Sequence, residues 1–195
     1  MSNFFPFLVY VFVTTFTPGP NNILSMTYGM RYGYRRTLNF LLGVASGFGS
    51  LLILCGFLNV FLTNILPQAR FWLNILGALY MFYLAYHILR SGPVEANSTQ
   101  KDLNSFRAGY ALQFVNLKGI LYSVTVYSLF ITPYFPGPLA VILFALLLAI
   151  IGFSAISSWA LGGNLFRNFL KKYYRWFNLA MAALLIYTAV ASLLH

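Results

Sequence analysis

Apolar runs long enough to cross a lipid bilayer constrain this chain more than any other feature of its sequence. Six such runs lie between clusters of Pro, Gly, Asn and basic residues, at about 4–29, 38–63, 71–90, 107–132, 139–161 and 174–194. A transmembrane helix needs about 20 predominantly apolar residues. Only 7% of the 195 residues are charged, against about 25% in an average soluble domain. The sequence therefore predicts an all-α integral membrane protein with six transmembrane helices.

The lysine and arginine residues predict how these helices are oriented. They gather after the first run, around the centre of the chain and after the fifth run, whereas Arg70 stands alone among the remaining connections. Basic connections usually face the cytoplasm, so we expect both termini on the opposite side. The net charge of +10 then reflects topology and contact with the headgroups of a lipid bilayer. It does not indicate binding to nucleic acid.

A polar segment at 91–106 divides the six runs into two halves. It holds both acidic residues, Glu95 and Asp102, and separates residues 1–90 from residues 107–195. Each half has three runs, so a second half that repeats the first must cross the membrane upside down, as in many secondary transporters. The segment Gly19–Leu24 can be laid over Asn116–Leu121. We predict two inverted-topology three-helix repeats joined by a cytoplasmic linker.

The first run contains a dense group of helix-breaking and polar residues, namely Pro18, Gly19, Pro20, Asn21 and Asn22. Each proline lacks an amide hydrogen, so the carbonyls of Thr14 and Phe16 lose their helical partners and the helix should break between about Thr14 and Asn22. A break inside a bilayer is tolerated where it faces protein or a water-filled cavity. Its two ends offer carbonyls to a cation and amides to an anion. We expect these residues to border a polar cavity that binds an amino acid, with a simple proline kink as the alternative.

Lys118 is the second candidate site residue. It is the only Lys, Arg, Asp or Glu deep in a predicted span, about 11 residues or ~16 Å from the cytoplasmic end. An ammonium at that depth costs at least ~2.5 kcal/mol unless it finds a partner, and the spans contain no acid. Because the first run breaks at a similar depth, both features can face one cavity. We predict that Lys118 holds a substrate carboxylate or carries a proton, with snorkelling to an interface as the alternative.

The chemistry of the spans argues against an enzyme. They contain no carboxylate, a single cysteine, Cys55, and no clustered histidines. An acid–base pair, a nucleophile with its base and a metal site would each need such groups. The sequence therefore predicts neither a metal ion nor another cofactor. A channel or a structural membrane subunit stays open as an alternative to a transporter.

These features together resemble the lysine-exporter superfamily (LysE/RhtB) of bacterial amino-acid exporters. The similarity runs along the whole chain and includes the segment Thr17-Pro-Gly-Pro-Asn-Asn-Ile-Leu24, the glycine-rich second run and the pair Asn116 and Lys118. The segment Ala111-Leu-Gln-Phe-Val-Asn-Leu-Lys118, followed by Ile120-Leu-Tyr122, is closer still to the cysteine and O-acetylserine exporter branch. The resemblance thus adds three residues to the candidate substrate-binding set: Gln113, Asn116 and Tyr122.

The resemblance implies an exporter of small neutral amino acids or their derivatives in a bacterial inner membrane, driven by the proton gradient. With the basic connections in the cytoplasm, both termini would be periplasmic, and a homo-oligomer is compatible with this function. A neutral substrate also follows from the residues, because recognition of a second ammonium would need a carboxylate in the cavity. The chain departs from the superfamily at Leu117, where most members have proline. We therefore expect the fourth helix to be less broken than the first, which argues against a symmetrical site with two breaks.

Overall fold

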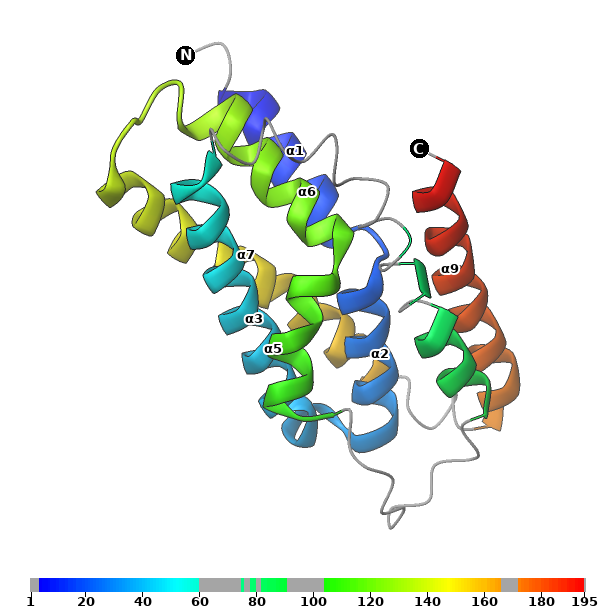
Figure 1. Cartoon of the computed structure of the whole chain (residues 1–195). Coiled ribbons are helices and arrows are strands. Elements are labelled where there is room, and N and C mark those ends of the chain that lie inside the picture. Colours follow the sequence, from blue (N-terminus) through cyan, green and yellow to red (C-terminus); the bar gives the residue numbers. More distant parts are fainter. Residues whose placement is uncertain are drawn as a thin grey trace.

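The computed structural model of the chain describes residues 4–59, 75, 78–79, 82–90, 104–165 and 172–194. All regular structure within these residues is helical (Figure 1). The labelled helices are α1 (Phe4–Phe16), α2 (Pro20–Tyr32), α3 (Tyr34–Phe57), α5 (Phe106–Val115), α6 (Leu117–Thr125), the π-helix η1 (Val126–Ile131), α7 (Pro138–Leu165) and α9 (Tyr174–Leu194). Residues 82–90 form a further helical segment.

Two of these helices are long and apolar enough to cross a membrane unaided. They are α3 with 24 residues and α7 with 28 residues. The helices α5 and α6, continued by η1, make a third candidate span that is bent by 64°. These findings confirm the all-helical class in the described residues. Part of the predicted span 71–90 and most of the linker 91–106 lie outside them, so the six-span inverted repeat stays a prediction.

Glycines bring the half-helices α2 and α5 into backbone contact with the two continuous helices. A Cβ atom at Gly29 of α2 would collide with the carbonyl of Ala160 on α7. At the second crossing, a Cβ atom at Gly43 of α3 would collide with the carbonyl of Phe106 on α5. Small residues allow transmembrane helices to approach this closely. Helix α2 therefore packs directly against α7, and α5 packs directly against α3.

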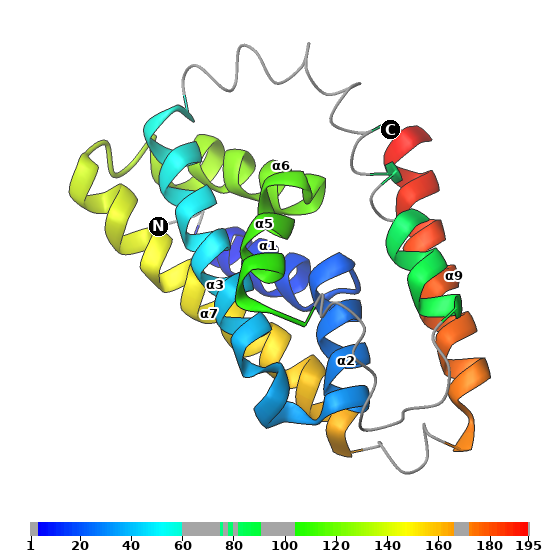
Figure 2. The same cartoon turned by 60° about the horizontal axis from the view of Figure 1, so that its bottom comes forward.

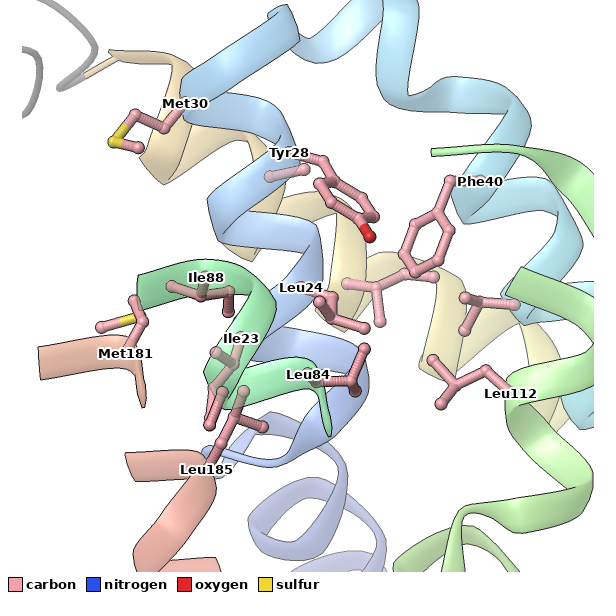
Figure 3. Close-up of a cluster of buried hydrophobic side chains, with 14 of the residues drawn as sticks. Ile23, Leu24, Tyr28, Met30, Phe40, Leu84, Ile88, Leu112, Met181 and Leu185 are labelled. Atoms are coloured by element: carbon pink, nitrogen blue, oxygen red, sulfur yellow. The ribbon is translucent and has the colours of Figure 1, made fainter. Parts of the chain in front are cut away.

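Two buried apolar clusters flank the broken helices. One joins α2 and α3 to residues 82–90 and α9, and includes Ile23, Leu84 and Leu185 (Figure 3). Residues 82–90 and α9 lie side by side along the flank of α2 (Figure 2). The other cluster joins α1, α6, η1 and α7 and includes Val11 and Tyr127. The breaks lie where the chain passes from one cluster to the other.

The helix ends sort into two sides of the bundle. The start of α1 and the end of α9 lie at the same end, at the top of Figure 1. The end of α2 and the starts of α3, α5 and α9 lie at the opposite end. Basic residues stand at or near these four ends: Arg31, Arg35, Arg36, Arg107, Lys172 and Arg175. The arrangement agrees with the separation of charge along the sequence, while the side that faces the cytoplasm stays a prediction.

Candidate functional site

The first predicted span is broken where the prolines stand. The helix α1 ends at Phe16, and α2 begins at Pro20 with Gly19 as its N-cap residue. Proline at the first position of a helix is well tolerated, because its missing amide hydrogen would have no helical partner there. The predicted interruption between Thr14 and Asn22 is therefore confirmed.

Side chains replace the two helical donors that the prolines remove. The hydroxyl of Thr17 donates to the Thr14 carbonyl at 3.1 Å, the acceptor that residue 18 would serve in a continuous helix. The indole N–H of Trp159 on α7 donates to the Phe16 carbonyl at 3.2 Å, in place of residue 20. Buried carbonyls without a donor are costly. The loss of both helical bonds is thus compensated inside the bundle.

Asn22 binds the end of α1 from the start of α2. Its side-chain Nδ2 donates to the carbonyl of Thr15 at 2.9 Å and to the carbonyl of Thr17 at 2.8 Å. Asn22 is buried, with 4% of its surface exposed. Because one amide spans both sides of the break, it fixes how the two half-helices meet.

A second break lies at Asn116, between α5 and α6. The backbone of Asn116 is extended, with φ −83° and ψ 91°, and its side-chain oxygen accepts a bond from the Gly119 amide at 3.4 Å. An asparagine at this position caps the following helix without any proline. The second break leaves one residue outside a helix, against three at the first, but it bends the chain by 64°. The expectation against a site with two breaks is therefore wrong, because a second break forms although Leu117 stands in place of proline.

Lys118 links the two breaks directly. Its Nζ lies 3.0 Å from the Thr17 carbonyl oxygen, 3.1 Å from Thr17 Oγ1 and 3.3 Å from the Pro18 carbonyl oxygen. Lys118 belongs to the first turn of α6, where a cation is unfavourable, but its ammonium reaches the negative end of α1. The structure thus brings together the two features that the sequence placed at similar depths.

Asn21 and Gln113 form a second link between the broken spans. Asn21 Nδ2 donates to Gln113 Oε1 at 2.9 Å, and Gln113 Nε2 donates to Asn21 Oδ1 at 3.2 Å. Gln113 also donates to the Gly109 carbonyl at 3.1 Å and is fully buried. The polar groups of Gln113 are therefore used to orient Asn21.

A cavity lies between the two breaks. It encloses about 520 Å³ of empty space, including the open solvent at its mouth. Seven of the nine predicted site residues line it: Gly19, Pro20, Asn21, Asn22, Asn116, Lys118 and Tyr122. Gln113 lies behind Asn21, and Pro18 contributes its carbonyl to Lys118. The first turns of α2 and α6 thus face the same space.

The rest of the cavity lining lies outside the predicted set of site residues. It is formed by Thr14, Thr15, Val44, Ala45, Phe48, Gly119, Gly152 and Ile156. Tyr122 stacks on Tyr10 with ring centres 5.6 Å apart and also packs on Phe48. In an apolar span, the sequence does not distinguish whether side chains such as Phe48 and Trp159 contact lipid, the buried core or a cavity. The cavity is therefore polar on the side of the breaks and mostly apolar elsewhere.

Comparisons with known proteins cover nearly the whole chain. Residues 12–195 match the LysE type translocator family. A cysteine/O-acetylserine efflux protein of Escherichia coli is 40% identical over 184 residues, which make up 94% of this chain and 94% of that protein. Proteins of the same name from Shigella flexneri and Shigella sonnei are 39% identical over the same share. No solved structure matches the chain.

Proposed function

The chain belongs to the LysE type translocator family, and on this premise we propose that it exports small neutral amino acids or derivatives of the cysteine and O-acetylserine type. The relatives that share 39–40% of its residues are named for efflux of these two compounds. Their match extends over 94% of both chains, so it includes both breaks and the cavity. We propose that this export takes place across a bacterial inner membrane, in which the chain is a multi-pass protein.

The observation that carries the proposal is the convergence of two helix N-termini and one lysine on a single cavity. Asn21 and Asn22 stand in the first turn of α2, and Lys118 and Gly119 in the first turn of α6. First-turn amides have no helical acceptor and attract anions. A substrate carboxylate between them would also gain a charge-assisted bond from Lys118.

The remaining walls fit the other parts of such a substrate. The oxygen atoms of Thr17 and Pro18 contact the Nζ of Lys118, a residue of the cavity lining, and they would accept bonds from an α-ammonium group. The apolar residues Val44, Phe48 and Ile156 offer room for a small uncharged side chain. The described residues contain no Asp or Glu, since both acids of the chain lie at positions 95 and 102. A second ammonium, as in lysine, would therefore lack a counter-charge.

We also propose that the proton gradient drives export and that Lys118 takes part in the coupling. Lys118 is the only Lys, Arg, Asp or Glu among the residues that line the cavity. A group that gains and loses a proton must change its contacts between states. Lys118 has two alternative sets of contacts, the oxygens of the first break and the carboxylate of the substrate. From the separation of the basic residues we further propose that both termini lie in the periplasm and the linker in the cytoplasm.

The inverted repeat is supported by the position of the two N-caps. The overlay of Gly19–Leu24 on Asn116–Leu121 puts Gly19, the N-cap of α2, over Asn116, the N-cap of α6. Both residues begin the second half of a broken span. Reporter fusions at the C-terminus test the proposed orientation, and cytoplasmic activity there would overturn both the topology and the inverted repeat.

Transport by the purified protein in liposomes tests the proposed function. Efflux of O-acetylserine and of cysteine, the latter under reducing conditions, is measured with and without an imposed pH gradient, and lysine serves as the comparison substrate. We expect saturable movement of the two neutral compounds, acceleration by the gradient, and no movement of lysine. Equal rates for lysine would refute the neutral-substrate proposal, and rates that do not respond to the gradient would refute proton coupling.

A further inference from the structure

Three oxygen atoms at the end of α1 surround the ammonium group of Lys118. They are the Thr17 carbonyl oxygen, Thr17 Oγ1 and the Pro18 carbonyl oxygen, at 3.0, 3.1 and 3.3 Å from Nζ. A primary ammonium has three N–H donors and no acceptor. The number of acceptors therefore equals the number of donors, and all of them lie at the negative end of a helix.

The preceding carbonyls of the break do not depend on Lys118. The carbonyls of Thr14, Thr15 and Phe16 receive bonds from Thr17, Asn22 and Trp159 respectively. Within the described part of the chain, Lys118 is the donor to Pro18 O and to Thr17 Oγ1. Removing the ammonium would leave a preformed group of oxygen atoms with spare acceptor capacity.

Gly19 provides the path by which Lys118 reaches these oxygens. A Cβ atom at residue 19 would lie 3.0 Å from Lys118 Cδ and 3.1 Å from Nζ. Contacts that short would force the lysine stem to move. Gly19 itself has extended backbone, so space for Lys118, rather than backbone conformation, accounts for a glycine at this position.

We propose that these oxygens form a binding site for a primary ammonium, which Lys118 fills while the transporter is empty and which the α-ammonium of the substrate takes over on binding. The substrate then occupies the oxygens of Thr17 and Pro18, and the released Lys118 turns to the substrate carboxylate. This exchange rests on the proposed function, because it identifies an ammonium subsite next to Gly19 and Lys118, which line the same cavity.

The exchange explains how the site would require both charged groups of an amino acid. Because Lys118 is tethered, its ammonium has a high effective concentration at these oxygens. An amine without a carboxylate therefore does not displace it. A carboxylate without an amine would draw Lys118 away and leave the break oxygens without their donor. Only a zwitterion satisfies both partners at once.

Binding of ethylammonium chloride to purified protein tests the site without any transport measurement. Thermal unfolding is followed for the parental protein, for Lys118→Ala, and for Lys172→Ala as a matched control at an exposed lysine just before α9. We expect ethylammonium to raise the unfolding temperature of Lys118→Ala progressively with concentration, by about 2–4 °C at roughly five times its dissociation constant. The parental protein and Lys172→Ala should show no such shift, because Lys118 still fills the site.

Two further comparisons identify the bound group and its ligands. Tetramethylammonium has no N–H donor and should not stabilise Lys118→Ala. Adding Thr17→Val, which removes Oγ1, should shrink the ethylammonium shift. Lys118→Ser is prepared in parallel, and ethylammonium present during purification should raise the yield of folded protein for either variant. The absence of any ethylammonium effect on both variants would overturn the proposal, as would an equal shift in the parental protein.

The same measurements separate this inference from the proposed function. If the parental protein exports O-acetylserine but neither Lys118 variant binds ethylammonium, the exchange is wrong and the exporter stands. If Lys118→Ala binds ethylammonium but the parental protein exports no amino acid, the ammonium site stands and the proposed function is wrong.

Discussion

At residues 17–20 the chain removes two amide hydrogens with prolines, whereas at Asn116 it keeps every amide and turns the backbone with one side-chain cap. The first break leaves carbonyls that need donors from elsewhere, and Asn22, Trp159 and Lys118 supply them. The second break is satisfied locally by Asn116 itself. One break is therefore tied to the rest of the bundle, and the other can form within its own helix.

The first break therefore depends more on tertiary structure than the second. Damage to the donors of the first break should disturb the relation of α1 to α2 and α6. Damage to the cap of the second break should act mainly on the start of α6. The substitutions below test that contrast, and they are given in order of decreasing expected effect.

Removing the charge that joins the two breaks should have the largest effect. Lys118→Met keeps much of the length and the apolar stem, but it loses the ammonium that holds the oxygens of Thr17 and Pro18. Loss of a hydrogen bond to a charged group costs about 1.5–3 kcal/mol, so O-acetylserine export in liposomes should fall about 10-fold or more. Membrane insertion and protein amount should stay near parental levels, since an ammonium in a span is itself costly.

The same substitution separates the two proposed roles of Lys118. A role in binding predicts weaker affinity for O-acetylserine, whereas a role in carrying protons predicts intact binding and loss of flux driven by pH. Both quantities are measured on one preparation, with Lys172→Met as the matched control. Export at the parental rate at every pH tested would show that Lys118 is structural.

Asn22→Ala should come next, because it removes the donor shared by both sides of the first break. The buried carbonyl of Thr15 would lose its donor, at a cost of about 1–3 kcal/mol. We expect a lower unfolding temperature together with reduced export. An unchanged unfolding temperature would mean that the prolines alone maintain the break.

Asn116→Ala should have a smaller effect than Asn22→Ala. Loss of an N-cap side chain costs about 0.5–2 kcal/mol, and among the described residues no side-chain hydrogen bond joins Asn116 to another helix. The pair is compared by thermal unfolding in the same detergent. An Asn116→Ala variant less stable than Asn22→Ala would reverse the proposed contrast between the breaks.

Leu117→Pro should have the smallest effect, even though it introduces a proline into a membrane helix. Leu117 is the first residue of α6, where proline is tolerated, and the extended backbone of Asn116 suits a residue that precedes proline. We expect a loss of about 1 kcal/mol or less, from the smaller buried side chain. Leu121→Pro, in the interior of the same helix, is the control and should cost about 3 kcal/mol or more. Similar losses in both variants would contradict the placement of the second break.

The contrast between the breaks also explains how far the sequence could predict the site. Two prolines in one turn remove hydrogen bonds by covalent structure, so the first break was predictable from Pro18 and Pro20 alone. An asparagine in a span can cap a helix, bind a neighbour or face a cavity, so Asn116 carried no comparable signal. The absence of proline at residue 117 therefore predicted a less broken helix and argued against two breaks, whereas the cap at Asn116 forms a second break without proline.

The contacts that site residues make with residues distant in the sequence were harder to predict than the site residues themselves. Lys118 was identified by its depth, and its nearness to the first break followed from similar depths in two helices. Its actual ligands, the oxygens of Thr17 and Pro18, depend on how α1 and α6 pack. Gln113 was a candidate for substrate contact, yet its amide is occupied by Asn21 and Gly109. The donor role of Trp159 could not be distinguished from ordinary packing in an apolar run.

The central claim is that both breaks border one substrate site, and protection of single cysteines by substrate tests it most directly. Thr15→Cys lies on the cavity wall at the first break and Gly119→Cys at the second, where an added Cβ meets only ordinary contacts. The native Cys55 is buried and should stay unreactive. Gly162→Cys, with open space around it and no part in the cavity, is the control.

Labelling by a small water-soluble thiol reagent is measured in the purified protein at increasing O-acetylserine concentrations. One shared site predicts that O-acetylserine slows labelling of Thr15→Cys and of Gly119→Cys with the same half-maximal concentration and leaves Gly162→Cys unaffected. Protection of one position alone, or of the two positions at clearly different concentrations, would contradict a single site between the breaks.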